Sequence, residues 1–267
     1  MELSKQKQTQ IKEYIGHSLT QTNLELEARI VPSFNSRITR EDFTNVIRRL
    51  KGNGFENITP EKNDTLDVRF KEKSNLRVSI HGMDAINDYC NENELSRVKK
   101  NITVMEKKRF SQKGRELRGI DVRDYNFRVN LKEEKPHKLS SRVVSEILGN
   151  DEGLDKLYRY KKRFSFLSTD KNFQFDLTMV KSSSKQEVKV PASQKAKKDL
   201  KNHDKRLVKK PVGETRDFNA WFNSLDDTGM VDLREDVYTK ALFFKNLEDS
   251  KTLENSLEYE IEIEYVG

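Results

Sequence analysis

Charged and apolar residues alternate strictly near both ends of this chain, and that period of two most constrains how it can fold. Glutamates occupy every second position at Glu25 and Glu27 and again from Glu258 to Glu264, with apolar residues or tyrosines between them. Side chains two residues apart on a β-strand lie on one face of a sheet. Each segment therefore predicts a strand with a carboxylate face and an apolar face. Closely ranked carboxylates repel each other unless cations lie among them.

Six further segments alternate in the same way, but their polar faces are mostly basic. Together with the two terminal segments they predict eight strands, over residues 24–30, 66–71, 76–80, 102–110, 125–134, 158–166, 173–179 and 258–265. Such strands can form an open sheet with its charges in water or a closed barrel with a polar lumen. Acids on the terminal strands and bases on the middle ones favour the barrel, because closure makes the first and last strands neighbours. Their glutamates would then form one oxygen cage for a metal, facing bases that hold a polyanion.

We therefore predict an α+β, mostly β fold: a closed eight-stranded antiparallel β-barrel with a charged lumen and helices packed outside. The composition agrees, since 36% of the 267 residues are charged, against about 25% in average globular chains. The clearest helix lies over residues 39–50, where Thr39 and Asp42 have the spacing of a capping box and Gly52 ends the pattern. Residues 4–15, 140–148 and 216–222 predict further helices less clearly.

One domain over residues 1–267 is expected, with a mobile Lys-rich insertion at 182–215. That insertion has ten Lys or Arg against four Asp or Glu and no sustained period, and the whole chain carries a net charge of +7. The alternative to a solvated loop is a basic arm that attracts RNA phosphates without sequence preference. A single cysteine, Cys90, excludes an internal disulfide, and no apolar run reaches the length of about 18 residues that a membrane helix needs. We expect an intracellular protein.

Motifs of other phosphate-handling classes are missing from the sequence. It has neither the glycine-rich P-loop of nucleotidases nor a Lys-Xaa-Asp-Gly motif for nucleotidyl transfer. The four histidines are scattered without the spacing of zinc ligands. The carboxylates and bases of the alternating strands are therefore the candidates for chemistry.

At these strands the chain resembles the triphosphate tunnel metalloenzymes, and among them the metal-dependent RNA triphosphatases of mRNA capping found in fungi, poxviruses and giant DNA viruses. The resemblance extends from about Leu24 to Val266. Its strongest elements are Glu25-Leu-Glu27, Arg159-Tyr-Lys161-Lys-Arg163 and Glu260-Ile-Glu262-Ile-Glu264. In that family the glutamate pairs bind the metal, and the strand with alternating bases holds the triphosphate.

The resemblance implies a role for each matching residue. Mg²⁺ or Mn²⁺ would be bound by Glu25, Glu27, Glu260, Glu262 and Glu264. The implied catalytic set is Arg77, Lys107, Glu134, Arg159, Lys161, Arg163 and Asp176. The implied substrate-binding set is Arg29, Arg69, Arg109, Arg128 and Lys132.

Some of these assignments have alternatives. Glu134 would orient the attacking water, but Glu133 takes its place if a bulge shifts the register. For Asp176 we favour orienting a tunnel base through a salt bridge. Arg29, Arg69 and Arg128 could instead serve only to neutralise carboxylates inside the barrel.

The leading hypothesis is a metal-dependent RNA 5′-triphosphatase, a phosphoric anhydride hydrolase with NTPase side activity that removes the γ-phosphate of nascent mRNA. It would be the N-terminal module of a capping enzyme, with a guanylyltransferase domain or subunit as partner and a viral cytoplasmic factory, virion or host nucleus as its location. One alternative is a tunnel enzyme that hydrolyses inorganic tripolyphosphate or free nucleoside triphosphates, or that polymerises polyphosphate. The other is a basic barrel that binds RNA without turnover.

Overall fold

The computed structural model describes residues 3–31, 37–112, 114–122, 125–191 and 235–267, which belong to two compact units. The larger unit comprises Met1–Ser184 and Phe243–Gly267. In the smaller one, β12 (Lys185–Pro191) and β13 (Glu235–Ala241) pair in an antiparallel hairpin. The expected insertion at 182–215 lies mostly outside the described residues, and the expected helix at 216–222 lies wholly outside them. The mobile insertion therefore stays a prediction.

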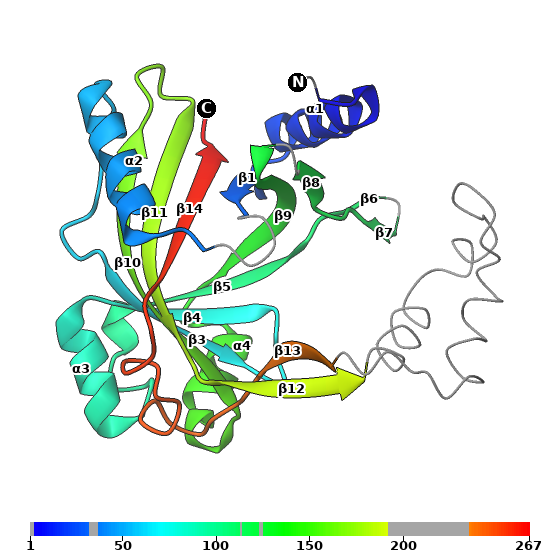
Figure 1. Cartoon of the computed structure of the whole chain (residues 1–267). Helices are drawn as coiled ribbons and strands as arrows, with labels where there is room; N and C mark the ends of the chain where they lie inside the picture. Colours follow the sequence, from blue (N-terminus) through cyan, green and yellow to red (C-terminus); the bar gives the residue numbers. More distant parts are fainter. Residues whose placement is uncertain (1–2, 32–36, 113, 123–124, 192–234) are drawn as a thin grey trace. The chain divides into compact units, whose positions relative to one another are not determined.

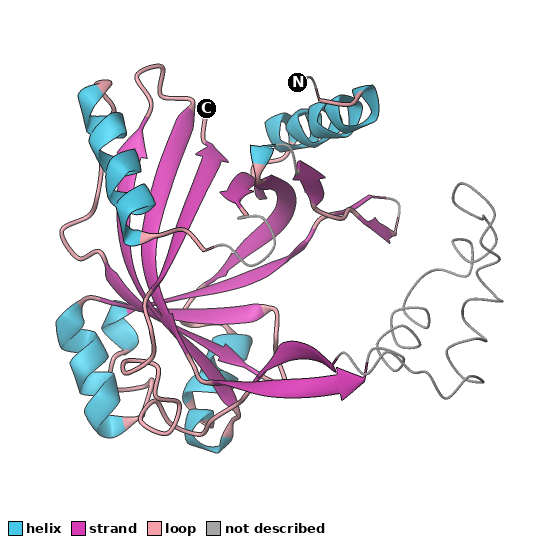
Figure 2. Cartoon of the chain, viewed as in Figure 1, coloured by secondary structure: helices cyan, strands magenta, loops and turns pink. Residues whose placement is uncertain are grey.

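The larger unit is built around a closed antiparallel barrel of eight strands, as the alternation predicts (Figures 1 and 2). Around the barrel the order is β1, β14, β11, β10, β3, β4, β5 and β9, and pairing of β9 with β1 closes it. The bounds are β1 (Leu24–Ile30), β3 (Asp64–Phe70), β4 (Leu76–His81), β5 (Ile102–Arg109), β9 (Phe127–His137), β10 (Lys156–Leu167), β11 (Phe173–Ser182) and β14 (Glu258–Tyr265). All eight predicted strands are confirmed.

Short strands extend the barrel at its margins. β2 (Glu56–Asn57) pairs with β10, and β8 (Ile120–Val122) pairs with β9. β6 (Ser111–Gln112) and β7 (Arg115–Glu116) form a separate hairpin. These strands add to the rim without interrupting the closed path.

Helices cover the apolar outside of the barrel. They are α1 (Lys5–Thr20), α2 (Arg40–Gly52), α3 (Met83–Glu92) and α4 (Arg142–Leu148), with 3₁₀ turns at Lys99–Asn101 and Asp151–Gly153. Phe43 and Leu50 of α2 pack in one core cluster with Leu177 of β11 and Ile261 of β14. Since these strand residues point outward, the charged residues at alternate positions point into the lumen.

The other helices cover different parts of the barrel exterior. Tyr14 of α1 belongs to a cluster with Leu26 of β1 and Leu131 of β9. Ile86 and Tyr89 of α3 belong to the largest cluster, which includes the outward side chains of β3 and β4. Among the helices that the structure describes, none combines the length and apolar character needed to cross a membrane.

The start of α2 shows the capping box that the sequence predicts. The Thr39 hydroxyl accepts a hydrogen bond from the Asp42 backbone N–H at 3.1 Å, and the Asp42 carboxylate accepts one from the Thr39 N–H at 3.0 Å. Two N–H groups that the helix leaves unpaired are thereby satisfied. This fixes where α2 begins as it packs on β11 and β14.

We predict that Thr39→Ala lowers the free energy of unfolding by about 1 kcal/mol, because an alanine at the N-cap cannot accept the hydrogen bond. Thr44→Ala, inside the same helix, is the matched control and should not destabilise, since alanine favours helix more than threonine does. Urea unfolding followed by circular dichroism measures both. Equal effects of the two substitutions would show that the cap does not matter.

Candidate active site

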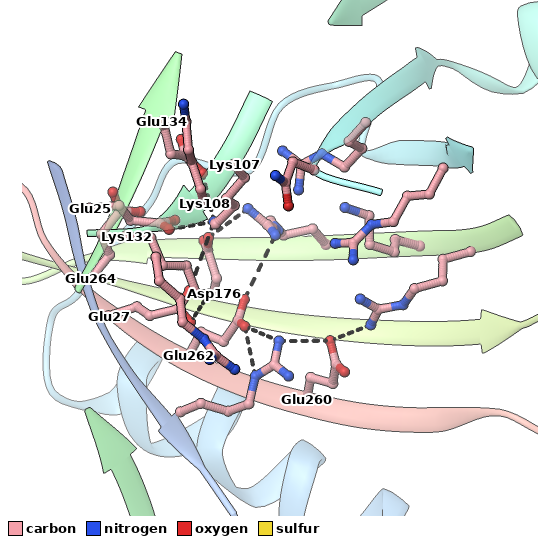
Figure 3. Close-up of a pocket in the computed structure, with 18 of the residues that line it drawn as sticks. Glu25, Glu27, Lys107, Lys108, Lys132, Glu134, Asp176, Glu260, Glu262 and Glu264 are labelled. Atoms are coloured by element: carbon pink, nitrogen blue, oxygen red, sulfur yellow. Dashed lines mark hydrogen bonds and ion pairs between the residues drawn. The ribbon is translucent and has the colours of Figure 1, made fainter. Parts of the chain in front are cut away.

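The lumen holds a cavity of about 550 Å³ with polar side chains around it (Figure 3). Its lining consists of Glu25, Glu27, Arg29, Arg69, Ser74, Asn75, Arg77, Lys107, Lys108, Arg109, Lys132, Glu134, Arg159, Lys161, Arg163, Asp176, Glu260, Glu262 and Glu264. Ten of these residues are basic and seven acidic, which leaves a net charge of +3. The net positive charge of the cavity therefore favours a polyanionic ligand, although acidic side chains also line the cavity.

Carboxylates gather where the first and last strands meet. The register sets Glu27 of β1 opposite Glu264 of β14, and Arg29 opposite Glu262. Burial raises the pKa of Glu264 to about 7, and the charges of Glu25, Asp176 and Glu134 add to the rise. Closure of the barrel brings these carboxylates together, as the sequence predicts.

Two lysines reach these carboxylates from neighbouring strands. Lys107 of β5 forms an ion pair with Glu25 and lies 2.6 Å from Glu134 Oε1 and 4.0 Å from Glu27 Oε2. Burial opposes the charge on Lys107, but Glu25 first, and then Glu134 and Glu27, raise its pKa above the usual value. Lys132 of β9 pairs with the buried Glu27. In this state the lysines neutralise the glutamates.

Arginines of β1 and β10 pair with the glutamates of β14. Arg29 donates from Nε to Glu262 Oε1 at 2.9 Å, and its Nη2 lies 3.7 Å from Glu260. Arg159 pairs with the same Glu260 at 2.7 Å. Burial alone would raise the pKa of Glu262, but Arg29, helped by Arg163, lowers it to about 2. Glu262 is therefore a carboxylate at any physiological pH.

Asp176 has the structural role that we favoured from the sequence. Its buried carboxylate accepts from Arg163 Nη1 at 2.8 Å and from the Ser165 hydroxyl at 2.7 Å. These contacts hold the Arg163 guanidinium toward the lumen. Asp176 thus positions a base, although it also lines the cavity.

Among the described residues, positive charge without an ion-pair partner lies on β3 and β4. Arg69 of β3 stands directly opposite Arg77 of β4, and neither forms an ion pair within the described ranges. Burial, and then the charge of Arg159, lowers the pKa of Arg69. The buried Nε of Arg77 has no hydrogen-bond partner. Such groups are costly unless an anion satisfies them, so this end fits phosphate oxygens.

Asp67 is a residue that the sequence analysis did not select. Its carboxylate lies 2.6 Å from Lys161 Nζ and accepts a hydrogen bond from Ser79 at 2.7 Å. Burial would raise its pKa, but Lys161 and Arg77 lower it to about 2. Alternation already placed Asp67 on the face of Arg69, and this was the available signal. Lys108, Ser74 and Asn75 also line the cavity without having been predicted.

Every predicted site residue lines the cavity except Arg128. Arg128 is half exposed, and its Nε and Nη2 pair with Asp121 of β8 at 2.5 and 3.0 Å. It sits outside this cavity because β8 supplies a partner at the rim. Glu134 is inside, whereas Glu133 accepts a hydrogen bond from Asn23 at 3.2 Å outside the cavity, so no bulge exchanges them.

The predicted metal ligands suit a hard divalent cation in chemistry. No three His, Cys, Asp or Glu side chains in the described part of the chain converge as a metal site, and lysines and arginines contact the carboxylates. Glu27 nevertheless stands opposite Glu264 on the paired strands, and Glu25 and Glu262 lie two residues from them on the same strands. Carboxylate oxygens are what Mg²⁺ and Mn²⁺ prefer. Burial raises the pKa of Glu264, and the nearby carboxylates of Glu25, Asp176 and Glu134 add to the rise, which a bound cation would oppose.

We predict that the affinity for tripolyphosphate falls above pH 8, because burial lowers the pKa of Lys161 to about 8 and Arg163 and Arg77 oppose its charge. Above that pH the Lys161 ammonium loses its proton, and Lys161 must take up a proton again when the anion binds. The affinity for tripolyphosphate then falls by up to about tenfold per pH unit. Lys161→Arg should remove this loss, since a guanidinium stays charged. Calorimetric titrations from pH 7 to 9.5 test the difference, and identical profiles for both proteins would refute it.

Comparisons with known proteins support the fold. No protein-family model matches the chain, and no curated protein matches it in sequence. Solved structures do match in fold, and three of them are of the triphosphatase of the Mimivirus capping enzyme. A triclinic crystal form has 19% identity and a TM-score of 0.57, covering 99% of this chain and 90% of that one. A monoclinic form has 17% identity and a TM-score of 0.54, with coverages of 99% and 90%.

The third structure is the RNA triphosphatase domain of a trifunctional Mimivirus mRNA capping enzyme. Its identity is 19% and its TM-score 0.53, over 100% of this chain and 91% of that one. All three alignments extend over nearly the whole of both chains. The chain therefore has the triphosphate-tunnel fold, in the form found in the RNA triphosphatase of the Mimivirus capping enzyme.

Proposed function

We propose that this protein is a metal-dependent RNA 5′-triphosphatase that removes the γ-phosphate from triphosphate-ended RNA. The observation that carries the proposal is a closed tunnel with carboxylates at one end and arginines free of ion pairs, within the described ranges, at the other. A triphosphate needs cationic groups along its length and charge neutralisation at the phosphorus under attack. The Mimivirus structures support this reading, since they are RNA triphosphatases in a capping enzyme.

The substrate would lie along the lumen with its γ-phosphate toward the glutamates. Arg69 and Arg77 supply guanidinium groups for phosphate oxygens, and Arg159 stands beside them. Arg163, held by Asp176, and Lys161, held by Asp67, face the middle of the cavity. Fixed cations aimed at the oxygens that gain charge stabilise the transition state more than the ground state.

The metal would be Mg²⁺ or Mn²⁺, held by Glu25, Glu27, Glu262 and Glu264, with Glu260 farther along β14. When bound, it would act as a Lewis acid on a γ-phosphate oxygen. Glu260 accepts from Arg159 and lies near Arg29, so its present contacts serve the basic end. We therefore assign Glu260 to holding these arginines.

Glu134 is the group that would orient the water. It lies beside Lys107 at 2.6 Å, and although burial opposes its charge, Lys107 and Arg77 lower its pKa. As a carboxylate at neutral pH it can accept a hydrogen bond from water. The water oxygen attacks the γ-phosphorus, the bond to the bridging oxygen breaks, and the RNA leaves with a 5′-diphosphate. The water proton passes to Glu134 and then to solvent.

The wider setting follows from the same proposal. Removal of the γ-phosphate leaves the diphosphate end that a guanylyltransferase would consume, so a guanylyltransferase domain or subunit is the proposed partner. Free nucleoside triphosphates carry the same triphosphate group, and we propose weaker activity on them. A viral factory, a virion or the host nucleus would be the place of action.

We predict that Glu27→Ala and Glu262→Ala each lower metal-dependent γ-phosphate release from triphosphate-ended RNA by at least about 100-fold, because each removes a charge that positions the reacting group. The measurement is release of radiolabelled phosphate with and without Mg²⁺ or Mn²⁺. Melting temperatures identify variants that fail to fold. Intact RNA binding without any release by the wild type would favour the non-catalytic barrel instead.

Neighbouring glutamates of β9 provide a sharper comparison. Glu134→Gln should lower kcat by about 100-fold or more with little change in KM, since the amide cannot take a proton from water. Glu133→Gln, one position earlier and outside the cavity, should keep wild-type kcat. Steady-state kinetics on the same RNA decides. A loss confined to Glu133→Gln would transfer the role to that residue.

A further inference from the structure

The first and last strands of the barrel, β1 and β14, share fewer register pairs than any other two neighbouring strands of the barrel. We call the line where they meet the seam. β1 and β14 share three register pairs, from Glu27 with Glu264 to Arg29 with Glu262. In contrast, β1 and β9 share seven pairs, and β11 and β14 share eight. Residues 258–261 of β14 therefore pair with β11 and not with β1. Ladder hydrogen bonds do not close the wall there.

A second hollow of about 490 Å³ lies at this seam. Four residues line both this hollow and the charged cavity, namely Glu27, Arg29, Lys132 and Glu260. They come from β1, β9 and β14, the strands beside the seam. The hollow and the cavity thus share a wall at the place where the strand pairing stops. We call this second space the side hollow.

The side hollow differs from the charged cavity in chemistry. The charged cavity is lined by polar and charged residues alone, whereas the side hollow also has Ile30, Val31, Ile38, Leu257 and Tyr259 in its lining. Val31 is 37% exposed and Leu257 38% exposed. Exposed apolar side chains gathered beside a phosphate-binding tunnel indicate a ligand with an apolar part.

We propose that the side hollow binds the 5′-terminal nucleoside of the substrate, its base against the apolar residues and its phosphates in the tunnel. The inference rests on the proposed function and names the part of the substrate that distinguishes a nucleotide from inorganic polyphosphate. Ligand pockets of about 300 to 1,000 Å³ hold molecules of this size. A base has two apolar faces, and ribose supplies hydroxyl groups.

Position and charge support this occupant. With the γ-phosphate at Glu27, Glu262 and Glu264, the other end of the triphosphate lies toward Arg159, whose partner Glu260 belongs to the wall shared with the side hollow. Arg37 and Arg128 also line the side hollow. Asp121 fixes Arg128 through two hydrogen bonds. An RNA chain continuing from the first nucleoside would pass these arginines, which gives Arg128 a role outside the tunnel.

The test compares three ligands by calorimetry: tripolyphosphate, ATP and a short 5′-triphosphate RNA, each in Ca²⁺ to slow turnover. The double variant Val31→Asn with Leu257→Asn leaves the net charge unchanged and removes apolar contact from the side hollow. It should weaken ATP and RNA binding about tenfold, with tripolyphosphate binding unchanged within twofold. Leu19→Asn, on α1 and 59% exposed, is the matched control and should change none of the three. Val31→Trp, which fills the side hollow, should cause the same selective loss.

The three ligands distinguish the possible sources of the nucleoside. Weakening of both ATP and RNA, or of RNA alone, supports binding of the RNA end, and weakening of ATP alone assigns the side hollow to free nucleotides. Equal weakening of all three ligands, or no weakening, overturns the proposal. Wild-type protein that binds ATP more tightly than tripolyphosphate but releases no phosphate from RNA would refute the proposed function while leaving the nucleoside site in place.

Discussion

Closure of the barrel through β1 is the constraint on which the rest of the molecule depends. β1 pairs with β9 on one edge and with β14 on the other, and the hydrogen bond from Arg29 to Glu262 spans 233 positions of the chain. Without this closure the glutamates of the two ends would lie on separate, solvated strand faces. Closure also leaves β1 no free edge to pair with other chains. Fold and site are therefore products of the same pairing.

Much of the fold could be predicted because a charged lumen makes the period of two visible on every barrel strand. Most residues that line the cavity were predicted for the same reason, since alternation sorts side chains into lumen and exterior. Helix α3 was not predicted because its first turn follows Gly82, at a φ of 87°, without a side-chain cap. The usual sequence signal for the start of a helix is therefore absent. Asp67 was not predicted, and Arg128 was predicted in the tunnel but lies outside the cavity, because their partners depend on which strands are neighbours, and one sequence does not give that order.

Charge balance explains how the lumen tolerates so many ionised groups. Most buried carboxylates contact a base from another strand, as Glu27 contacts Lys132 and Asp67 contacts Lys161. Removing a charge from such a network leaves its partner buried and unpaired, which costs more than the pair itself contributes. The exceptions are Arg69 and Arg77, whose uncompensated charge persists because the barrel holds their strands in register.

The same balance couples the two ends of the cavity. Lys107 contacts Glu25 and Glu134, and Lys132 contacts Glu27. A phosphate group that binds these lysines leaves the charge of the glutamates uncompensated, and a divalent cation bound among the glutamates would restore neutrality. Conversely, a cation that binds the carboxylates frees the lysines to bind phosphate. Because each event removes the electrostatic cost of the other, anion and cation should bind with positive cooperativity.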